Sequence, residues 1–272
     1  MVGQMIDGPP ANGHDNILVE HDAAGIVTVT LNNPARRNAM SFAMWQGLGE
    51  IYTSLGKRSD VRVVILTGAG GNFCAGADIS EFSKVRNTEA SAKIYNQAGE
   101  FATHAIIDLP QPTIAAVNGY GVGGGCGLAL ACDLRVGESS TQMGIPAARL
   151  SIVYSTLDCD LLLRAVGLAN AKLVLYSGRY FKLAECQAMG LVDIVSPDGA
   201  LVGAKALAAE LATRAPLSQR GAKVVLEALA RGETSRRADE IDTAQAAAVN
   251  SQDYREAAKA FLEKRTPVFT GH

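Results

Sequence analysis

The feature that most constrains the fold is a glycine-rich stretch at residues 118–128, NGYGVGGGCGL, with six glycines in eleven residues. It follows an apolar run at 113–117 that is typical of a buried strand, and it precedes an apolar run at 128–131 that is typical of a helix. Glycines in such a turn let backbone N–H groups approach a ligand with no side chain in the way. The stretch therefore predicts a strand-loop-helix unit whose loop binds either a phosphate or a developing oxyanion.

A second glycine-bearing loop at residues 68–82, GAGGNFCAGADISEF, has the same setting. It follows a buried strand predicted at 61–67, and a helix is expected to begin near its end. Two such loops on neighbouring turns can each aim one N–H group at a single oxygen. That arrangement forms an oxyanion hole, which stabilises the developing charge by several kcal/mol. The pair of loops favours this interpretation over glycines that serve packing alone.

The glycine-rich stretch also contains the dinucleotide-binding pattern GxGxxG, at Gly119, Gly121 and Gly124. A lone match of this kind is weak support for a dinucleotide fold. Glu138 lies at a suitable distance, but its segment is not typical of a second long parallel strand, and no second mononucleotide-binding half follows. A P-loop is excluded because the Gly-Lys-Ser/Thr sequence is missing. We prefer the oxyanion site.

The remaining periodicity predicts further local elements. Residues 17–20 and 26–31 indicate a β-hairpin, and a helix is expected to begin after Ser41, a candidate N-cap. A charged stretch at 81–89 is expected to be mobile, and residues 150–167 are expected to form a helix.

Three regions follow from this pattern. Residues 1–16 are polar, contain Gly-Pro-Pro, and are predicted to be a disordered tail. Residues 17–199 are predicted to form a β/α core that carries the ligand site. Residues 200–272 are predicted to form alanine-rich amphipathic helices. Since such helices bury little apolar bulk inward, we expect them to pack against a partner subunit.

Composition narrows the partners. The 25 basic and 27 acidic residues give a formal net charge of −2, so no basic field favours nucleic acid. Five cysteines without paired or zinc-type spacing predict buried free thiols and no metal site. The apolar runs are too short to span a membrane, and no signal peptide is visible. The expected location is the cytoplasm.

The two loops resemble the signature segments of the crotonase, or enoyl-CoA hydratase/isomerase, superfamily. The resemblance rests on LTGAGGNFCAGADISEF at 66–82 and AAVNGYGVGGGCGLALACDLRV at 115–136. It extends to LNNPARRNAM at 31–40, to residues 178–195 and to FLEKRTPVFTG at 261–271. It implies an α/β (α+β) fold, a ββα spiral core, and trimers or dimers of trimers built through the C-terminal helices. It also implies an acyl-CoA thioester substrate and no resident cofactor, because coenzyme A enters as part of the substrate.

The resemblance implies roles for individual residues. It places the two oxyanion N–H donors at Ala77 and Gly124, and the adenine of coenzyme A at the backbone around Ala75. Arg36 and Arg37 fall in the loop that contacts the CoA phosphates. A neighbouring subunit is expected to complete the nucleotide site with Phe261 and Lys264. The further residues expected along the substrate are Gly76, Asp78, Gly123, Gly127 and Ala147.

The sequence departs from the family pattern at two positions. Hydratases of this family use one glutamate three residues after the oxyanion glycine, where this chain has Gly127, and another after a proline, where Ala147 follows Pro146. Glycine and alanine transfer no proton, so hydration by the two-glutamate route is not expected. Their small size widens the pocket for a bulky or branched acyl group. The site therefore carries out another reaction on the enolate, uses a relocated base, or only binds acyl-CoA.

Candidates for the missing groups can be ranked. Tyr154 aligns with a tyrosine of the superfamily's methylmalonyl-CoA decarboxylase, and its phenol could orient an acyl carboxylate or carry a proton. Arg149 could meet a substrate carboxylate, although a surface ion pair is the simpler role. Asp158 and Asp160 begin a helix, where stabilisation of the helix N-terminus explains them. Glu81 could reach the acyl end, although a solvated face is the simpler interpretation.

Two hypotheses remain open. The first is an acyl-CoA-processing enzyme in which Ala77 and Gly124 stabilise a thioester enolate, with Tyr154 as the candidate catalytic side chain. Within it, decarboxylation suits the pocket because loss of CO₂ generates the enolate without a base. The second is a non-catalytic acyl-CoA-binding protein that kept the scaffold.

Overall fold

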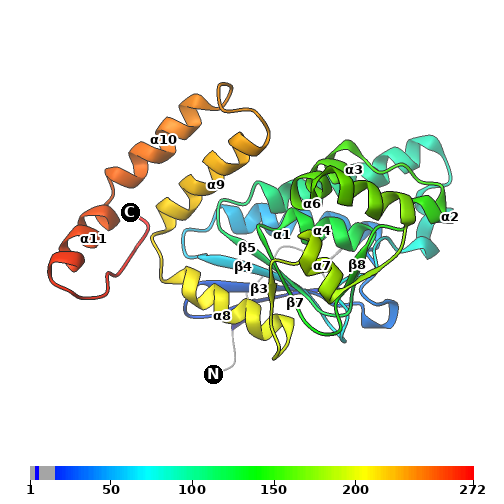
Figure 1. Cartoon of the computed structure of the whole chain (residues 1–272), viewed down its shortest axis with the longest axis horizontal. Helices are drawn as coiled ribbons and strands as arrows, with labels where there is room; N and C mark the ends of the chain where they lie inside the picture. Colours follow the sequence, from blue (N-terminus) through cyan, green and yellow to red (C-terminus); the bar gives the residue numbers. More distant parts are fainter. Residues whose placement is uncertain (1–3, 6–15) are drawn as a thin grey trace.

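The computed structural model describes residues 4–5 and 16–272. Its centre is a seven-stranded sheet of order β1-β2-β3-β4-β5-β7-β10 (Figure 1). The strands are β1 (Gln4–Met5), β2 (Ile17–His21), β3 (Ile26–Leu31), β4 (Val63–Gly68), β5 (Thr113–Val117), β7 (Leu134–Gly137) and β10 (Ile194–Val195). The first three pair antiparallel, with Ile17 opposite Leu31, and the pairings from β3 to β10 are parallel. The predicted hairpin is confirmed, whereas the predicted tail at 1–16 lies outside the described residues except at 4–5 and 16.

A second, three-stranded sheet joins the two glycine loops. It contains β6 (Tyr120–Val122), β8 (Gln142–Gly144) and β9 (Phe181–Lys182). Cys74 of the first loop pairs with β6, since its N–H donates to the Tyr120 carbonyl at 2.8 Å and its own carbonyl accepts from the Val122 N–H at 2.9 Å. The strand within the glycine-rich stretch, which the sequence did not reveal, therefore fixes the two loops side by side.

The large sheet is buried on both faces because successive side chains along a strand point into two different cores. Val64 and Leu66 pack into the larger core with helices α1 (Phe42–Gly56), α3 (Glu89–Ile107), α4 (Gly124–Ala131) and α6 (Thr156–Ser177). Val63 and Ile65 face the opposite way, toward α8 (Ala200–Ala212). Ser41 caps α1 as predicted, because its hydroxyl accepts the Met44 N–H at 3.1 Å.

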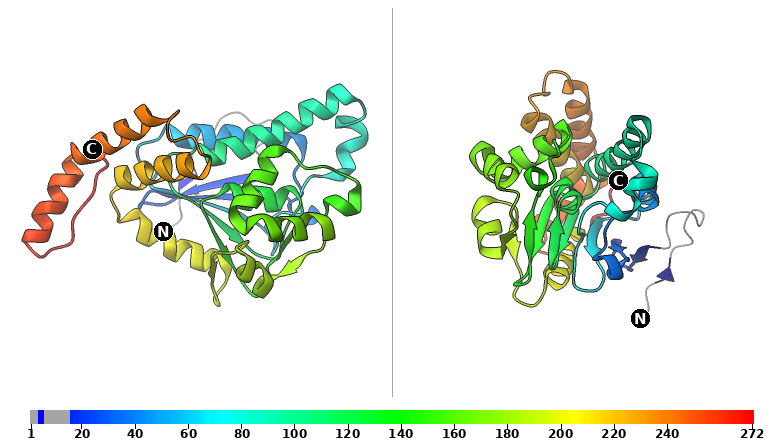
Figure 2. Two further views of the ribbon diagram at one scale, coloured as in Figure 1. Left: turned by 45° about the horizontal axis from the view of Figure 1, so that its top comes forward. Right: turned by 90° about the vertical axis from the view of Figure 1, so that its right-hand side faces the viewer.

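Helix α8 lies directly on the sheet. Its buried residues Ala200, Ala204 and Ala208 are four residues apart, so one small-residue stripe faces β4, β5 and β7. The boundary that the sequence predicted between residues 199 and 200 therefore falls between the sheet and α8, the helix that covers it. Helix α9 (Pro216–Ala230) follows α8, and the helices that extend away from the sheet, orange and red in Figure 2, are α10 (Ala238–Val249) and α11 (Gln252–Leu262).

The prediction of a helix at 150–167 is wrong at the start of that helix. Short helix α5 (Ala147–Leu150) ends at Ser151, which has a left-handed φ of 54°, and α6 begins only at Thr156. The cause is local, since the Ser155 hydroxyl accepts the Asp158 N–H at 3.1 Å and thereby caps α6. Helix α6 continues past Gly167, where the helical backbone is interrupted.

The stretch at 81–89 contains regular structure. A 3₁₀ turn, η2 (Ile79–Glu81), leads into α2 (Phe82–Val85), and Thr88 caps α3 through a reciprocal bond with Ser91. The other short elements are η1 (Pro34–Arg36) and α7 (Leu183–Met189), which Gly190 caps at its C-terminus.

The fold class is the predicted one, a mixed α/β architecture in which strand-loop-strand-helix units repeat. All five cysteines are free thiols; four are buried and Cys159 is half-buried. Within the described part of the chain, no helix is long and apolar enough to cross a membrane.

Candidate functional site

The two glycine loops meet closely enough that a side chain would not fit. A Cβ atom on Gly125 would lie 2.2 Å from the Cys74 carbonyl oxygen, well inside van der Waals contact. Gly76 adopts a φ of 92°, and a Cβ there would lie 3.3 Å from the Gly124 nitrogen. Glycine at these positions is therefore what allows the backbones of the two loops to touch.

Two backbone N–H groups at this meeting point are without partners. The backbone of Met40 is hydrogen-bonded to the residues on either side of Ala77. Its N–H donates to the Gly76 carbonyl at 2.7 Å, and its carbonyl accepts the Asp78 N–H at 2.9 Å. The N–H of Ala77 is thus left out of the pairing with Met40. Gly124 is the first residue of α4, where an N–H has no acceptor one turn earlier. Neither N–H donates to any residue that the structure describes.

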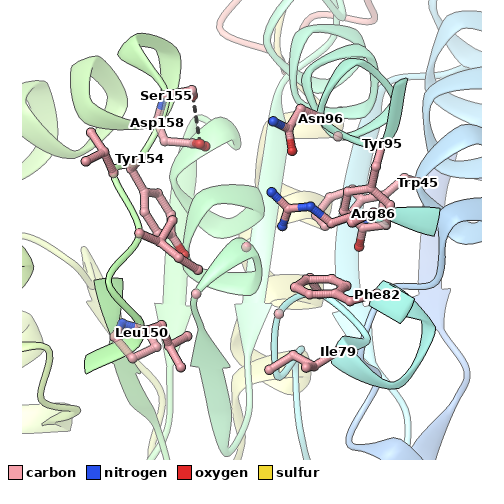
Figure 3. Close-up of a pocket in the computed structure, with 18 of the residues that line it drawn as sticks. Trp45, Ile79, Phe82, Arg86, Tyr95, Asn96, Leu150, Tyr154, Ser155 and Asp158 are labelled. Atoms are coloured by element: carbon pink, nitrogen blue, oxygen red, sulfur yellow. Dashed lines mark hydrogen bonds between the residues drawn. The ribbon is translucent and has the colours of Figure 1, made fainter. Parts of the chain in front are cut away.

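Both groups border one cavity of about 550 Å³ (Figure 3). A Cβ on Gly124 would lie 3.9 Å from the Ala77 nitrogen, so the two donors are close together. Two convergent N–H donors can bind one oxygen atom, and the N-terminus of α4 adds positive partial charge. The volume suits a small-molecule site, which commonly occupies about 300–1,000 Å³.

One wall of the cavity comes from α1 and α3. The Trp45 indole N–H donates to the Tyr95 hydroxyl at 3.0 Å, and that hydroxyl donates to the Met40 carbonyl at 3.3 Å. Burial raises the pKa of Tyr95 to about 12, so the phenol keeps its proton at neutral pH. The Trp45 ring lies 3.2 Å from where a Cβ on Gly124 would be. An ordered aromatic side chain therefore borders the Gly124 N–H.

Arg86 stands on the same wall and points into the cavity in Figure 3. Its guanidinium carbon lies 4.7 Å from the centre of the Phe82 ring and 5.4 Å from that of Tyr95. It makes no ion pair with a carboxylate among the described residues. The cavity thus contains a cation held by aromatic faces and left without an acidic partner.

The opposite wall is formed by the segment that leads into α6. The Tyr154 hydroxyl oxygen lies 3.4 Å from where a Cβ on Gly123 would be, beside the second loop. Burial raises the pKa of Tyr154 above the ordinary value of a phenol. At neutral pH Tyr154 is therefore a hydrogen-bond donor and not a base.

Asp158 follows on the same wall (Figure 3). The Ser155 hydroxyl donates to its Oδ2 at 2.8 Å. Its Oδ1 lies 3.1 Å from where a Cβ on Gly127 would be, so the carboxylate occupies space beside that glycine. Burial raises the pKa of Asp158, the charge of Glu100 raises it further, and the bond from Ser155 opposes the change.

Arg36 and Asp78 are paired with each other. One guanidinium nitrogen of Arg36 donates to both carboxylate oxygens of Asp78, at 2.9 and 2.8 Å. The Asp78 carboxylate also caps η2 by accepting the Ser80 N–H. Burial opposes ionisation of Asp78, but the Ser80 bonds and the Arg36 charge together lower its pKa. Asp78 therefore ties down the first loop, and Arg36 neutralises it.

The other expected substrate contacts fall into two groups. Ala75, Gly76 and Gly123 border the cavity with the two donors. Arg37 stacks its guanidinium 5.2 Å from the Tyr120 ring centre, and its carbonyl accepts the Ala75 N–H at 2.9 Å.

Besides Arg36, Arg37 and Asp78, four further expected residues do not border the cavity. Gly127 lies in the buried part of α4, and Ala147 is packed in the core. Phe261 belongs to α11, and Lys264 follows that helix, which lies at the opposite end of the molecule from α2 and α3 (Figure 1). Within one chain, the structure brings neither Phe261 nor Lys264 to the cavity.

Sequence reasoning missed the wall built by α1, α2 and α3, including Trp45, Arg86 and Asn96. A usable signal was the glycine inside α3, because Tyr95, Gly99 and Thr103 are four residues apart and share one face. A Cβ on Gly99 would meet nothing within 4 Å, which shows open space at the cavity. In residues 4–5 and 16–272, no group of three or more His, Cys, Asp or Glu residues is placed to hold a metal ion.

Comparison with known proteins shows the family to which the chain belongs. Residues 21–272 match the family described as enoyl-CoA hydratase/isomerase. The human mitochondrial enoyl-CoA hydratase domain-containing protein 2 is 34% identical over 262 residues, 91% of this chain and 86% of the relative. The short-chain-enoyl-CoA hydratase of Clostridium acetobutylicum is 32% identical over 260 residues, 92% and 96% of the two chains. The crystal structure of an enoyl-CoA hydratase from Bacillus anthracis superposes with a TM-score of 0.89 at 32% identity, covering 95% of this chain and all of that one.

Proposed function

Because the chain belongs to the enoyl-CoA hydratase/isomerase family, we propose that it processes acyl-CoA thioesters by binding the thioester oxygen between the N–H groups of Ala77 and Gly124. The observation that carries this proposal is the pair of unpartnered N–H groups on one cavity wall. Such donors act on the charge that develops when the thioester becomes an enolate. Removing one of them from a comparable site costs about 2.7–4 kcal/mol of transition-state stabilisation.

The rest of the substrate would follow the two loops. We propose that the adenine lies at the backbone around Ala75 and that Arg37 meets the CoA phosphates, since Arg36 is already occupied by Asp78. This chemistry requires no resident cofactor because coenzyme A arrives with the acyl group.

Two-glutamate hydration is not the reaction that we propose. Gly127 and Ala147 carry no ionisable group, and general acid–base catalysis contributes about a hundredfold to ten-thousandfold for each group. We therefore expect slow hydration of crotonyl-CoA compared with a two-glutamate hydratase. An efficient rate would mean that another acid supplies the missing proton transfer.

Decarboxylation is a second candidate reaction, and Arg86 is the observation that favours it. Its unpaired guanidinium could hold a carboxylate on the acyl chain across the cavity from Tyr154. When the carbon–carbon bond to that carboxylate breaks, CO₂ leaves and the electron pair forms the enolate without any base. A Tyr154 phenol that stays protonated could then donate a proton to the carbanion carbon.

A panel of CoA esters separates these possibilities. The protein would be incubated with crotonyl-, butyryl-, malonyl- and methylmalonyl-CoA, and the products followed by mass spectrometry against a protein-free control. Turnover of any ester supports an enzyme. Micromolar binding without turnover would support the alternative, a non-catalytic acyl-CoA-binding protein. Arg86→Gln assigns the reaction, because it should slow only the esters that carry a carboxylate.

We further propose that the chain assembles as a trimer or dimer of trimers through its C-terminal helices. Apolar side chains on these helices are exposed in the single chain, including Leu226, Leu229, Tyr254, Phe261 and Leu262. Phe261 and Lys264 would then complete the nucleotide site of a neighbouring subunit. Light scattering after size-exclusion chromatography checks the assembly, and a monomer at micromolar concentration would contradict it.

A further inference from the structure

The carboxylate of Asp158 takes up the space that a side chain at position 127 would fill. Its Oδ1 lies 3.1 Å from where a Cβ on Gly127 would be. Asp158 comes from the first turn of α6 and Gly127 from α4, so the two meet only in the folded chain. The cavity is therefore bordered by a carboxylate on α6, whereas the neighbouring position of α4 carries a glycine.

We propose that Asp158 is the general base that moves the proton at the carbon next to the thioester carbonyl. This inference rests on the proposed function, because it needs an enolate held by Ala77 and Gly124. All three residues border the same cavity. Figure 3 shows Asp158 and Tyr154 on one wall and Arg86 on the other.

The two oxygens of this carboxylate have different surroundings. Oδ2 accepts the Ser155 hydroxyl at 2.8 Å, which fixes the rotation of the side chain. Oδ1 accepts no hydrogen bond from any residue that the structure describes. One oxygen is therefore held and the other is available for a substrate proton, directly or through one water molecule.

The proposed step needs no further reactant. Oδ1 takes the proton from the carbon next to the thioester carbonyl, and the electrons of the broken C–H bond form the carbon–carbon double bond of the enolate. The carbonyl electrons move onto the oxygen between the two N–H donors. Return of the proton to the same carbon, or to a conjugated one, regenerates the carboxylate.

The surroundings suit a base. Burial and the charge of Glu100 on α3 raise the pKa of Asp158. The neutral phenol of Tyr154 and the thiols of Cys126 and Cys159 are the other titratable groups near it. A carboxylate whose pKa lies above its ordinary value is a stronger base, closer to neutral pH where such a base works best.

Helix capping is the competing explanation. Ser155 caps α6 in either case, and a carboxylate in the first turn stabilises any helix. Asp160 provides the matched control because it lies one position beyond the same turn and pairs with Arg164 at 3.0 Å, on the surface of the helix. A purely structural role predicts similar modest effects for both aspartates.

Exchange of the α-protons of butyryl-CoA in D₂O tests the inference. We expect Asp158→Asn to slow this exchange about 100-fold or more while the Kd for butyryl-CoA stays within about twofold, because only proton transfer is lost. Asp160→Asn should leave exchange unchanged. If the exchange rate of Asp158→Asn is within about threefold of the wild-type rate, the inference is overturned and the proposed function is left intact. No exchange by the wild-type protein would overturn the inference as well, whereas the proposed function fails only if no ester of the panel is turned over.

Ser155→Ala adds a readout that holds even if Asp158→Asn folds poorly. It keeps the carboxylate and removes the bond that opposes the raised pKa of Asp158. Because the base must be ionised, the rising limb of the exchange rate against pH should move to higher pH. A limb that stays in place would contradict a role for Asp158 in proton transfer.

Discussion

The cavity has two halves of different construction. The backbone half consists of the glycine loops, with the N–H groups of Ala77 and Gly124, and the side-chain half consists of Trp45, Arg86, Tyr95, Tyr154 and Asp158. In the first half the binding groups belong to the main chain, and glycines are required because the loops touch. In the second half each group is a replaceable side chain. On the function that we propose, oxygen binding is therefore built into the backbone, whereas the reaction depends on residues that substitution can change.

The largest effect is expected where the backbone half loses a donor. Gly124→Pro removes the N–H at the first position of α4, where proline is otherwise tolerated. We expect kcat on the best substrate to fall at least about 100-fold to 1,000-fold, as for other oxyanion donors.

Gly124→Ala is the control for that substitution. It keeps the N–H and adds only a Cβ, 3.2 Å from the Trp45 ring. Turnover by the proline variant within about tenfold of the alanine variant would show that this N–H does not bind the reacting oxygen.

A stability comparison between two glycines should sharpen the contrast between the halves. Gly125→Ala puts a Cβ 2.2 Å from the Cys74 carbonyl oxygen, so we expect a loss of about 1–3 kcal/mol or more in unfolding free energy. Gly99→Ala meets open space inside α3 and should be neutral or stabilising by up to about 1 kcal/mol. Urea denaturation measures both. Equal effects would contradict the distinction.

In the side-chain half, Tyr154→Phe removes one hydroxyl beside Gly123. A hydrogen bond to a charged group contributes about 1.5–3 kcal/mol, so we expect a fall in kcat of about tenfold or more with an unchanged fold. Steady-state kinetics on the best substrate checks this. Unchanged activity would remove Tyr154 from the mechanism.

The smallest effect concerns pH and stability. Because the pKa of Asp158 is raised on folding, the folded state holds its proton at pH values where the unfolded chain has lost it. Its stabilising contribution is therefore present at low pH and is lost as pH rises through the raised pKa. Asp158→Asn should gain stability relative to wild type as the pH rises above the ordinary range of a carboxyl group, about pH 4, measured by urea denaturation. A difference that is independent of pH would contradict this.

The backbone half could be predicted from sequence because its signals are local. Two apolar runs followed by glycine loops predicted two loops that aim N–H groups at one oxygen, the family resemblance assigned these groups to Ala77 and Gly124, and the structure brings both residues to one cavity. The Ser41 cap and the hairpin at 17–31 also depend on near neighbours. The strand β6 was not foreseen, since it forms by pairing with β8 and with Cys74 of the first loop, both of which are distant in sequence.

The side-chain half depends on contacts between distant segments. Arg86 and Asn96 were not singled out because nothing in a charged helix shows that it closes a cavity. Asp158 was assigned to helix capping, which the Ser155 bonds support, but its approach to Gly127 needs the packing of α6 on α4. The start of α6 was also misplaced, because Ser155 competes with the helical pattern before it.

A crystal structure with bound butyryl-CoA would show directly where the thioester oxygen lies. We predict that it lies about 2.7–3.1 Å from both the Ala77 and the Gly124 nitrogen. A thioester oxygen more than about 3.5 Å from both nitrogens, with the acyl group ordered in the cavity, would contradict it.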